Sequence, residues 1–466
     1  MIVVVAMIVA AVFLRRRLLR FHEQAGQIAL FPLIESHFQP TPVANLTVSE
    51  RQFPFRVRAD LHKALDRLFE TGTTVLRFCG GKKEYERLGL SMSDCLDPGI
   101  QDPVRVAPLH YEEVDIGEEA PVRCLRAGIW FLERDGERFL MMLTAFESFQ
   151  GITSVKFEIA VPNSPAGMSI VNWFFKHLEE SVLRADSYRG KILSLEQSDH
   201  SYSGASSGIT VHKLQTVSRE QVILPRTTLD LLDRNVIEFS RQRDRLRKLG
   251  QATKKGLLFY GPPGTGKTHT IHYLTRALPG HTTLIVTAEQ VGLLGEYMTL
   301  ARLLQPSIVV IEDVDLIARD RSSMQSTCEE VLLNKLLNEM DGLKESADIL
   351  FILTTNRPEA LEAALASRPG RVDQAIEFPL PDDEGRAKLV RLYSQGVSLN
   401  EDLIEIIVRK TDRVSASFIK ELMRRITQYS LERNGDGELQ LADVENALDE
   451  MLFRGGTLNL KLLGAA

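Results

Sequence analysis

Residues 256–268 read GLLFYGPPGTGKT, and this stretch decides the fold of the chain. Its apolar part, residues 257–260, predicts a buried strand. The glycine-rich part that follows has the spacing G-x-x-x-x-G-K-[ST] of a phosphate-binding loop. Beyond the loop, Ile271, Tyr273 and Leu274 recur at helical spacing, so a helix is predicted to begin there. A strand, this loop and a helix, in that order, make the phosphate-binding interpretation specific.

Each part of the loop has a task in binding a nucleotide. Glycines let backbone N–H groups curl around phosphate oxygens, and the start of the helix adds the positive end of its dipole. Lys267 is expected to reach the β- and γ-phosphates of ATP, and the Thr268 hydroxyl is expected to bind Mg²⁺. The predicted nucleotide-binding residues are Gly261, Pro262, Pro263, Gly264, Thr265, Gly266, Lys267, Thr268 and His269.

An acidic element lies at residues 307–316, which read SIVVIEDVDL. Its apolar residues predict a buried strand that delivers Glu312 and Asp313 at its carboxyl end. Ligands of open α/β sheets bind at that edge. We therefore expect Glu312, together with Thr268, to hold Mg²⁺, and Asp313 to orient the water that attacks the γ-phosphate. A solvated acidic turn is the alternative interpretation.

Short apolar runs alternate with helical patterns through the second half of the chain. Runs that are apolar throughout, with helices between them, predict parallel strands buried on both faces. The predicted fold class is therefore α/β, a P-loop NTPase sheet with helices on both faces over residues 222–385. A small helical lid is predicted over residues 386–455, and its strongest helix carries an apolar face formed by Phe418, Ile419, Leu422, Met423 and Ile426.

An α+β domain is predicted upstream, over residues 45–198. Its expected elements are a helix capped by Asp60, a hairpin turning at Asp135 and Gly136, and a helix after Pro165. Histidine and acidic residues are sparse here, and none has the spacing of metal ligands. We therefore expect a recognition or assembly domain. Residues 199–221, which begin with DHSYSGASSG, are expected to be a linker.

The composition excludes several classes of protein. The chain has 466 residues, enough for two or three domains, with 44% apolar and 25% charged residues. These fractions exclude a collagen-like, a disordered and a polytopic membrane protein. The formal net charge of -6 gives no sign of nucleic-acid binding. The four cysteines form no Cys-x-x-Cys pair and fit reduced thiols in a cytosolic compartment.

The N-terminus departs from these averages. Residues 1–14 contain no polar side chain, and Arg15, Arg16 and Arg17 follow directly. No basic segment precedes the apolar run, which argues against a secretory signal peptide. Residues 1–20 are predicted to anchor a cytoplasmic protein to the inner membrane, although residues 1–14 span only about 21 Å as a helix. The alternatives are a short core helix or a start codon assigned too far upstream.

Taken together, the motifs resemble those of the AAA family of ATPases, within the AAA+ class. The resemblance covers residues 224–452, about half of the chain. It rests on the segments GPPGTGKT (261–268), QPSIVVIEDVD (305–315), LLNKLLNEMDGL (332–343), TTN (354–356), SRPGRVD (367–373) and PLPDDEGR (379–386). They occur in the order that the family has, so the match is highly specific.

The resemblance implies roles for three further residues. Asn356 would position the water near the γ-phosphate. Arg368 and Arg371 would reach the nucleotide of the neighbouring subunit and stabilise charge that develops during hydrolysis. Arginines that act in this way require a homo-oligomeric ring, which is a hexamer in most of the family. A surface ion pair is the alternative role for the two arginines.

Three positions depart from the family's pattern. The family has Asp-Glu where this chain has Glu312-Asp313, and Asp315 fixes the register, so the two acids are swapped. The Glu-Asp order resembles the branch that contains the mitochondrial Rieske-protein translocase. Leu293 stands where the family often has an aromatic pore residue, so the resemblance does not imply threading of an unfolded chain. The lid reads VSASF at 414–418, in place of a Gly-Ala-Asp pattern.

These observations imply a Mg²⁺-ATP-dependent ring ATPase that remodels or translocates a protein client. No His-Glu-x-x-His occurs in the sequence, which excludes the membrane-protease branch. The alternative is a nucleotide-switched scaffold with little turnover. A nucleic-acid motor is the least favoured, because no nucleic-acid-binding motif is found. The basic run RQRDRLRK at 241–248 allows a nucleic-acid contact, although a solvated or inter-subunit face is the preferred interpretation.

Overall fold

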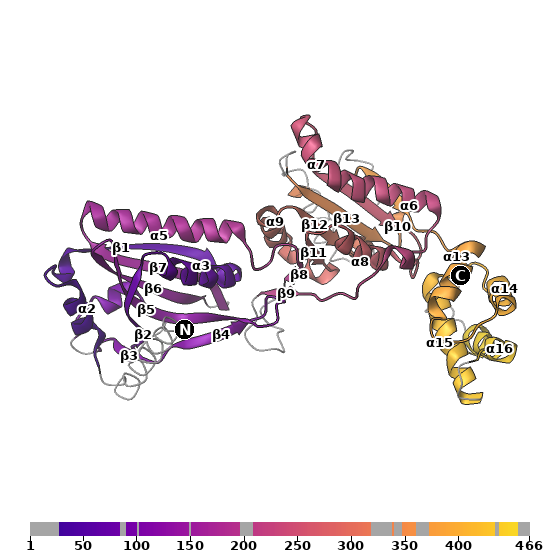
Figure 1. The fold of residues 1–466 in the computed structure, drawn as a ribbon, viewed down its shortest axis with the longest axis horizontal. Coiled ribbons are helices and arrows are strands. Elements are labelled where there is room, and N and C mark those ends of the chain that lie inside the picture. Colours follow the sequence, from indigo (N-terminus) through magenta and orange to yellow (C-terminus); the bar gives the residue numbers. More distant parts are fainter. Residues whose placement is uncertain are drawn as a thin grey trace, which may run out of the picture. The chain divides into compact units, whose positions relative to one another are not determined.

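The computed structural model describes residues 28–83, 90–99, 102–148, 151–195, 208–317, 338–339, 347–359, 372–433 and 438–454. The chain divides into two units, which Figure 1 shows in colours that follow the sequence. The first unit contains the residues up to Tyr188 and the segment Glu196–Val211, and the second contains Arg189–Leu195 and the chain from His212 onward. The anchor predicted over residues 1–20 lies outside the described residues. No helix within the described part is long and apolar enough to cross a membrane.

The first unit is built on an antiparallel sheet with the strand order β1-β7-β6-β5-β2-β3, in which β4 also pairs with β5. The strands are β1 (Leu46–Pro54), β2 (Thr74–Lys82), β3 (Arg105–Ala107), β4 (His110–Val114), β5 (Val122–Arg134), β6 (Glu137–Ser148) and β7 (Gly151–Pro162). The helices are α2 (Leu30–Phe38), α3 (Arg58–Glu70), α4 (Met92–Cys95) and α5 (Pro165–Arg184), and the short strand β9 (Ile209–Val211) follows.

Helices cover both faces of this sheet. Trp130 of β5 lies 5.9 Å from Phe69 of α3, measured between ring centroids. The next residue, Phe131, points to the other face and joins a buried cluster with Leu30 of α2 and Met92 of α4. Successive side chains of a strand alternate between its faces, so the sheet is buried on both sides.

The predicted hairpin of the first unit is confirmed, and the predicted helix cap is wrong. Asp135 and Gly136 both have positive φ, 53° and 81°, as a two-residue turn between β5 and β6 requires. Helix α3 begins at Arg58, so Asp60 lies inside its first turn. The Asp60 carboxylate instead accepts a hydrogen bond from the backbone N–H of Ser187 at 2.9 Å. A long-range partner has replaced the local one.

The second unit is built on a parallel sheet, as predicted. Its strands run in the order β14-β10-β13-β12-β11-β8, and each of these neighbouring pairs is parallel. The strands are β8 (Ile192–Leu195), β10 (Lys255–Tyr260), β11 (Thr282–Val286), β12 (Ser307–Ile311), β13 (Ile349–Thr355) and β14 (Gln374–Glu377). Leu257 and Phe259 join a buried cluster with Ile271 of α8, while Leu258 between them is buried on the opposite face.

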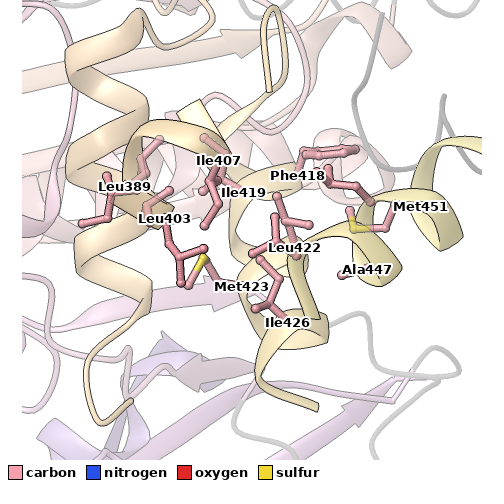
Figure 2. Packing of buried hydrophobic residues seen from close by; sticks show 14 of the residues in the cluster. Leu389, Leu403, Ile407, Phe418, Ile419, Leu422, Met423, Ile426, Ala447 and Met451 are labelled. Atoms are coloured by element: carbon pink, nitrogen blue, oxygen red, sulfur yellow. The ribbon is translucent and has the colours of Figure 1, made fainter. Parts of the chain in front are cut away.

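Helices flank this sheet and form the lid. Those of the larger part are α6 (Arg226–Leu232), the π-helical turn η5 (Asp233–Glu238), α7 (Phe239–Lys248), α8 (Lys267–Ala277), α9 (Leu294–Leu303) and α10 (Val314–Ile317). The lid consists of α13 (Asp383–Tyr393), α14 (Glu401–Lys410), α15 (Ala416–Arg433), α16 (Leu441–Asp449) and η7 (Glu450–Arg454). Figure 2 shows that the apolar face predicted on α15 packs into the lid core, where Phe418, Leu422 and Ile426 are fully buried.

The strand β8 differs from expectation. The sequence placed residues up to 198 with the first domain, but Ile192 and Leu193 pair with Thr283 and Leu284 of β11 in the second unit. Leu193 and Leu195 are fully buried there. The sequence pattern identifies an apolar segment but carries no information on which neighbouring sheet receives it.

The buried Tyr297 and its neighbour Gln290 hold the end of β8 through hydrogen bonds. The hydroxyl of Tyr297, on α9, accepts the Leu195 N–H at 2.7 Å and donates to Oε1 of Gln290 at 2.9 Å. Gln290 in turn donates from Nε2 to the Leu195 carbonyl at 2.9 Å. Both polar groups of the Leu195 backbone are therefore satisfied inside the protein.

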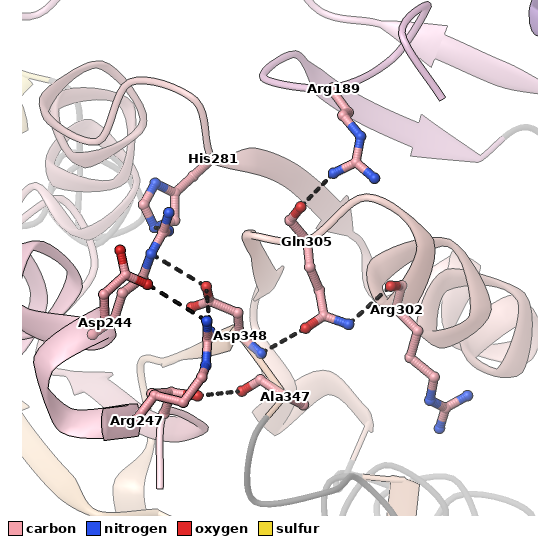
Figure 3. A network of polar contacts seen from close by, with 10 residues as sticks. Arg189, Asp244, Arg247, His281, Arg302, Gln305, Ala347 and Asp348 are labelled. Atoms are coloured by element: carbon pink, nitrogen blue, oxygen red, sulfur yellow. Dashed lines mark hydrogen bonds and ion pairs between the residues drawn. The ribbon is translucent and has the colours of Figure 1, made fainter. Parts of the chain in front are cut away.

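Polar contacts hold the amino ends of the strands together, as Figure 3 shows. Gln305 accepts the N–H of Asp348 through Oε1 at 2.7 Å, and Arg189 donates to the Gln305 carbonyl. The Asp348 carboxylate lies 3.2 Å from both Arg243 Nε and Arg247 Nη2. Part of the basic run at 241–248 is thus engaged in ion pairs within this unit.

Replacing Tyr297 by Phe should lower the stability of the second unit. The substitution removes one oxygen and leaves the buried Leu195 N–H without its acceptor, so the free energy of unfolding should fall by about 1–3 kcal/mol in urea denaturation. The control is Leu249→Ala, because the Leu249 side chain is 74% exposed and its loss should change stability by less than about 0.5 kcal/mol. Equal midpoints for the two variants would show that the hydrogen bond between Tyr297 and Leu195 does not stabilise the unit.

Candidate functional site

The phosphate-binding loop joins the carboxyl end of β10 to the first turn of α8. Gly261 has φ 147°, and a Cβ there would come within 2.2 Å of the Phe378 carbonyl oxygen. Gly264 has φ 77°, and a Cβ there would lie 2.0 Å from Oγ of Ser417 on the lid. Only glycine fits these two positions, because each combines an unusual backbone conformation with a close neighbour.

Lys267 lies inside the loop and is largely buried. Its Nζ donates to the carbonyl oxygens of Gly261 at 2.8 Å and Pro262 at 3.0 Å. Burial lowers the pKa of Lys267 from 10.5 to about 8, an effect that the charges of Asp313 and Asp315 partly oppose. The ammonium is therefore held by weak backbone acceptors at a place where an anion would be a better partner.

Thr268 and Glu312 lie together at the mouth of the loop. The Thr268 hydroxyl donates to Oε1 of Glu312 at 2.9 Å. The Glu312 N–H donates to the Val286 carbonyl at 3.1 Å, which ties the residue to the end of β11. A hydroxyl and a carboxylate this close are oxygen donors of the kind that Mg²⁺ takes from a protein, with phosphate and water supplying the rest. The donor pair fits this ion, although no group of three His, Cys, Asp or Glu able to hold a metal occurs among the described residues.

Asp313 and Asn356 form a second pair. Asn356 donates from Nδ2 to Oδ1 of Asp313 at 3.0 Å. Asp313 has a positive φ of 49°, and its N–H donates to the Thr354 hydroxyl at 3.0 Å. The two carboxylates of the acidic motif therefore have different partners: Glu312 contacts the loop threonine, and Asp313 contacts the asparagine after β13.

A cavity of about 390 Å³ opens beside the loop. Its walls come from residues 221–224, residues 263–270, Asp313, Thr354, Asn356 and the lid residues Leu389, Tyr393, Ala416, Ser417 and Lys420. The Ser417 N–H donates to the Gly264 carbonyl at 3.1 Å, so the lid helix α15 touches the loop directly. His269 lines the same cavity, and its Nε2 lies 3.2 Å from the Gln221 carbonyl oxygen.

The structure brings most of the predicted residues to one edge of the sheet. Residues 263–269, Asp313 and Asn356 line the cavity, and Glu312 contacts Thr268. Gly261 and Pro262 serve instead as acceptors for Lys267. Arg368 and Arg371 lie outside the described residues. Leu293, at the expected pore position, ends the 3₁₀ segment η6 (Ala288–Leu293), just before α9.

Sequence reasoning missed several residues at this site. Residues 221–224 and Tyr393 form cavity walls, and Lys420, the fifth residue of α15, also lines the cavity. None of these carries a motif.

Comparisons with known proteins agree with this geometry. Residues 257–380 match the family described as "ATPase family associated with various cellular activities (AAA)". The proteasome-activating nucleotidase of Methanothermobacter thermautotrophicus is 34% identical over 44% of this chain and 52% of its own length. The ATP-dependent zinc metalloprotease FtsH 3 of Sphaerobacter thermophilus is 33% identical over 47% of this chain and 46% of its own length.

A third relative is a 26S proteasome regulatory subunit 6B homolog of Encephalitozoon cuniculi. It is 33% identical over 46% of this chain and 58% of its own length. The chain thus spans about half the length of the curated relatives that it matches.

The affinity for ATP should fall as the pH rises above about 8. Phosphates favour the charged ammonium of Lys267, so above its pKa of about 8 the site must take up a proton to bind the nucleotide. Binding constants from calorimetry should change little near pH 7 and weaken by up to tenfold per pH unit beyond 8. Lys267→Arg is the control, because its guanidinium stays charged and removes this dependence. A flat wild-type profile from pH 7 to 9.5 would contradict the prediction.

Proposed function

We propose that this chain, whose residues 257–380 form an AAA ATPase domain, hydrolyses ATP with Mg²⁺ and uses the energy to remodel or translocate a protein client. One observation carries the proposal. The loop lysine, the Thr268–Glu312 pair and the Asp313–Asn356 pair all lie at one edge of the parallel sheet, beside a cavity that the lid closes on another side.

Each residue has a task in hydrolysis that follows from its position. Backbone N–H groups of residues 263–268 and the Lys267 ammonium hold the phosphates. Thr268 and Glu312 supply oxygen ligands for Mg²⁺, which, when bound, neutralises charge on the β- and γ-phosphates. Asp313 accepts a proton from, or orients, the attacking water. Asn356 holds the Asp313 carboxylate in place through its Nδ2.

The swapped acids fit this division of tasks. Glu312 has the longer side chain and reaches Thr268 across the edge of the sheet. Asp313 occupies a left-handed backbone position, which Asp tolerates better than Glu does. Because the Asp side chain is one methylene shorter, the attacking water would lie closer to the backbone. This shorter reach also supports the second candidate function, a nucleotide-switched scaffold with slow turnover.

We propose a homo-oligomeric ring, with a hexamer as the expected size. Arg368 and Arg371 match the family's paired arginines and would act on the nucleotide of the neighbouring subunit. The relatives are named as parts of a proteasome system and as a metalloprotease, and both names concern proteins that act on other proteins. They support a protein client, which the first unit would recognise. Anchoring to a membrane through residues 1–20 stays a prediction.

Asp313→Asn should separate an ATPase from a scaffold. The variant keeps the hydrogen bond from Asn356 but cannot accept a proton from water, so kcat should fall about 100-fold or more while ATP affinity is retained. Phosphate release and nucleotide binding are measured side by side, with Lys267→Ala as the variant that should lose binding itself. Wild-type turnover no faster than that of Asp313→Asn would favour the scaffold.

Mixing two inactive variants should test the ring. Arg371→Ala should bind ATP without turning it over, and Lys267→Ala should fail to bind. In mixed rings some intact loops face intact arginines, so part of the ATPase activity should return. Each variant alone serves as the control. No recovery at any mixing ratio, with both proteins oligomeric by light scattering, would argue against action across subunits.

A further inference from the structure

We propose that Asp315 is a positioning residue for hydrolysis, which orders Asn356 and through it the carboxylate of Asp313. The inference rests on the proposed ATPase function. It gives a role to Asp315, which the sequence analysis considered only as the residue that fixes the register of the acidic motif.

Asp315 is buried at the start of the short helix α10, with 2% of its surface exposed. Its Oδ1 accepts two hydrogen bonds, from the Thr355 hydroxyl at 2.9 Å and from the Asn356 N–H at 3.2 Å. The Thr355 oxygen accepts in turn from the Arg357 N–H at 2.9 Å. One carboxylate oxygen therefore holds the three-residue turn that leaves β13.

That turn carries the side chain that contacts Asp313. Asn356 is fixed at its backbone by Asp315 and reaches Oδ1 of Asp313 with Nδ2 at 3.0 Å. Asp313 lies only two residues before Asp315, so Asn356 links two acids of the same short segment, Asp315 through its backbone N–H and Asp313 through its side chain. On its backbone side, Asp313 is held by the Thr354 hydroxyl at 3.0 Å.

Burying the Asp315 carboxylate costs free energy that its hydrogen bonds must offset. A carboxylate removed from water is expensive unless hydrogen bonds replace its hydration. Here the donors are a hydroxyl and a backbone N–H, and hydrogen bonds to an ionised acceptor are stronger and better directed than neutral ones. Such bonds fix the direction of the Asn356 side chain, and the geometry of the Asp313 carboxylate depends on that direction.

Three variants test the role. Asp315→Ala should lower kcat about 10- to 100-fold and change the dissociation constant of ATP by less than about threefold, because the phosphate contacts of the loop are untouched. Asp315→Asn keeps an acceptor at Oδ1 and should recover most of the lost kcat. Thr355→Val removes one of the two donors with little change of shape, and should lower kcat even if Asp315→Ala does not fold.

A double-mutant cycle separates positioning from a general loss of stability. If Asp315 acts through Asn356, then Asp315→Ala should have little further effect on kcat in an Asn356→Ala background. The matched control is Asp443→Ala: Asp443 is also 2% exposed, but it lies on α16 of the lid and pairs with Arg433. It should lower the thermal unfolding midpoint and leave kcat unchanged.

The outcomes are distinguishable. Absence of wild-type ATP hydrolysis would overturn the proposed function itself. Measurable wild-type hydrolysis, with Asp315→Ala and Thr355→Val as fast as wild type, would overturn the positioning role alone. The positioning role would also be overturned if Asp315→Ala lowered kcat by the same factor in the Asn356→Ala background as in the wild-type protein. Non-additive losses, rescued by Asp315→Asn and absent in Asp443→Ala, are the result that we expect.

Discussion

The candidate site depends on one constraint, the parallel pairing of β10, β13 and β12. Phe259 pairs with Thr354, and Leu353 pairs with Ile311, so all three strands end at the same edge of the sheet. The glycine-rich loop, Asn356 and the acidic pair follow these strands directly. A shift of any strand by one residue would turn its side chains to the opposite face and break the contacts between the three segments.

The strand ends also explain how much of the site could be predicted. The loop, the acidic pair and Asn356 each follow an apolar run of a length typical of buried strands, so local pattern was enough to place them at the carboxyl edge. The walls of the cavity were not predictable in this way. Tyr393 and Lys420 become neighbours of the loop only because the lid folds back over it, and residues 221–224 reach it from the segment before α6. No spacing within the sequence records these contacts.

The fold was predictable to a similar degree and for similar reasons. The parallel sheet, the apolar face of α15 and the Asp135–Gly136 turn follow from periodicity and turn chemistry over a few residues. The expected cap at Asp60 was wrong because a carboxylate that can cap a helix can also bind a distant N–H group, as it does at Ser187. The sheet that β8 joins was not predicted, because strand pairing depends on contacts between residues that are distant in sequence. The structure of residues 1–20 is not described, so the predicted anchor stays a prediction.

The pairing of β8 with β11 also makes the units discontinuous along the chain. Arg189–Leu195 belong to the second unit and its parallel sheet, and the chain rejoins that unit at His212. A protein that begins after residue 198 would therefore lack β8, expose backbone groups of β11 that pair with it, and remove the Leu195 N–H that the Tyr297 hydroxyl accepts. The division between the two units lies about ten residues earlier, between Tyr188 and Arg189.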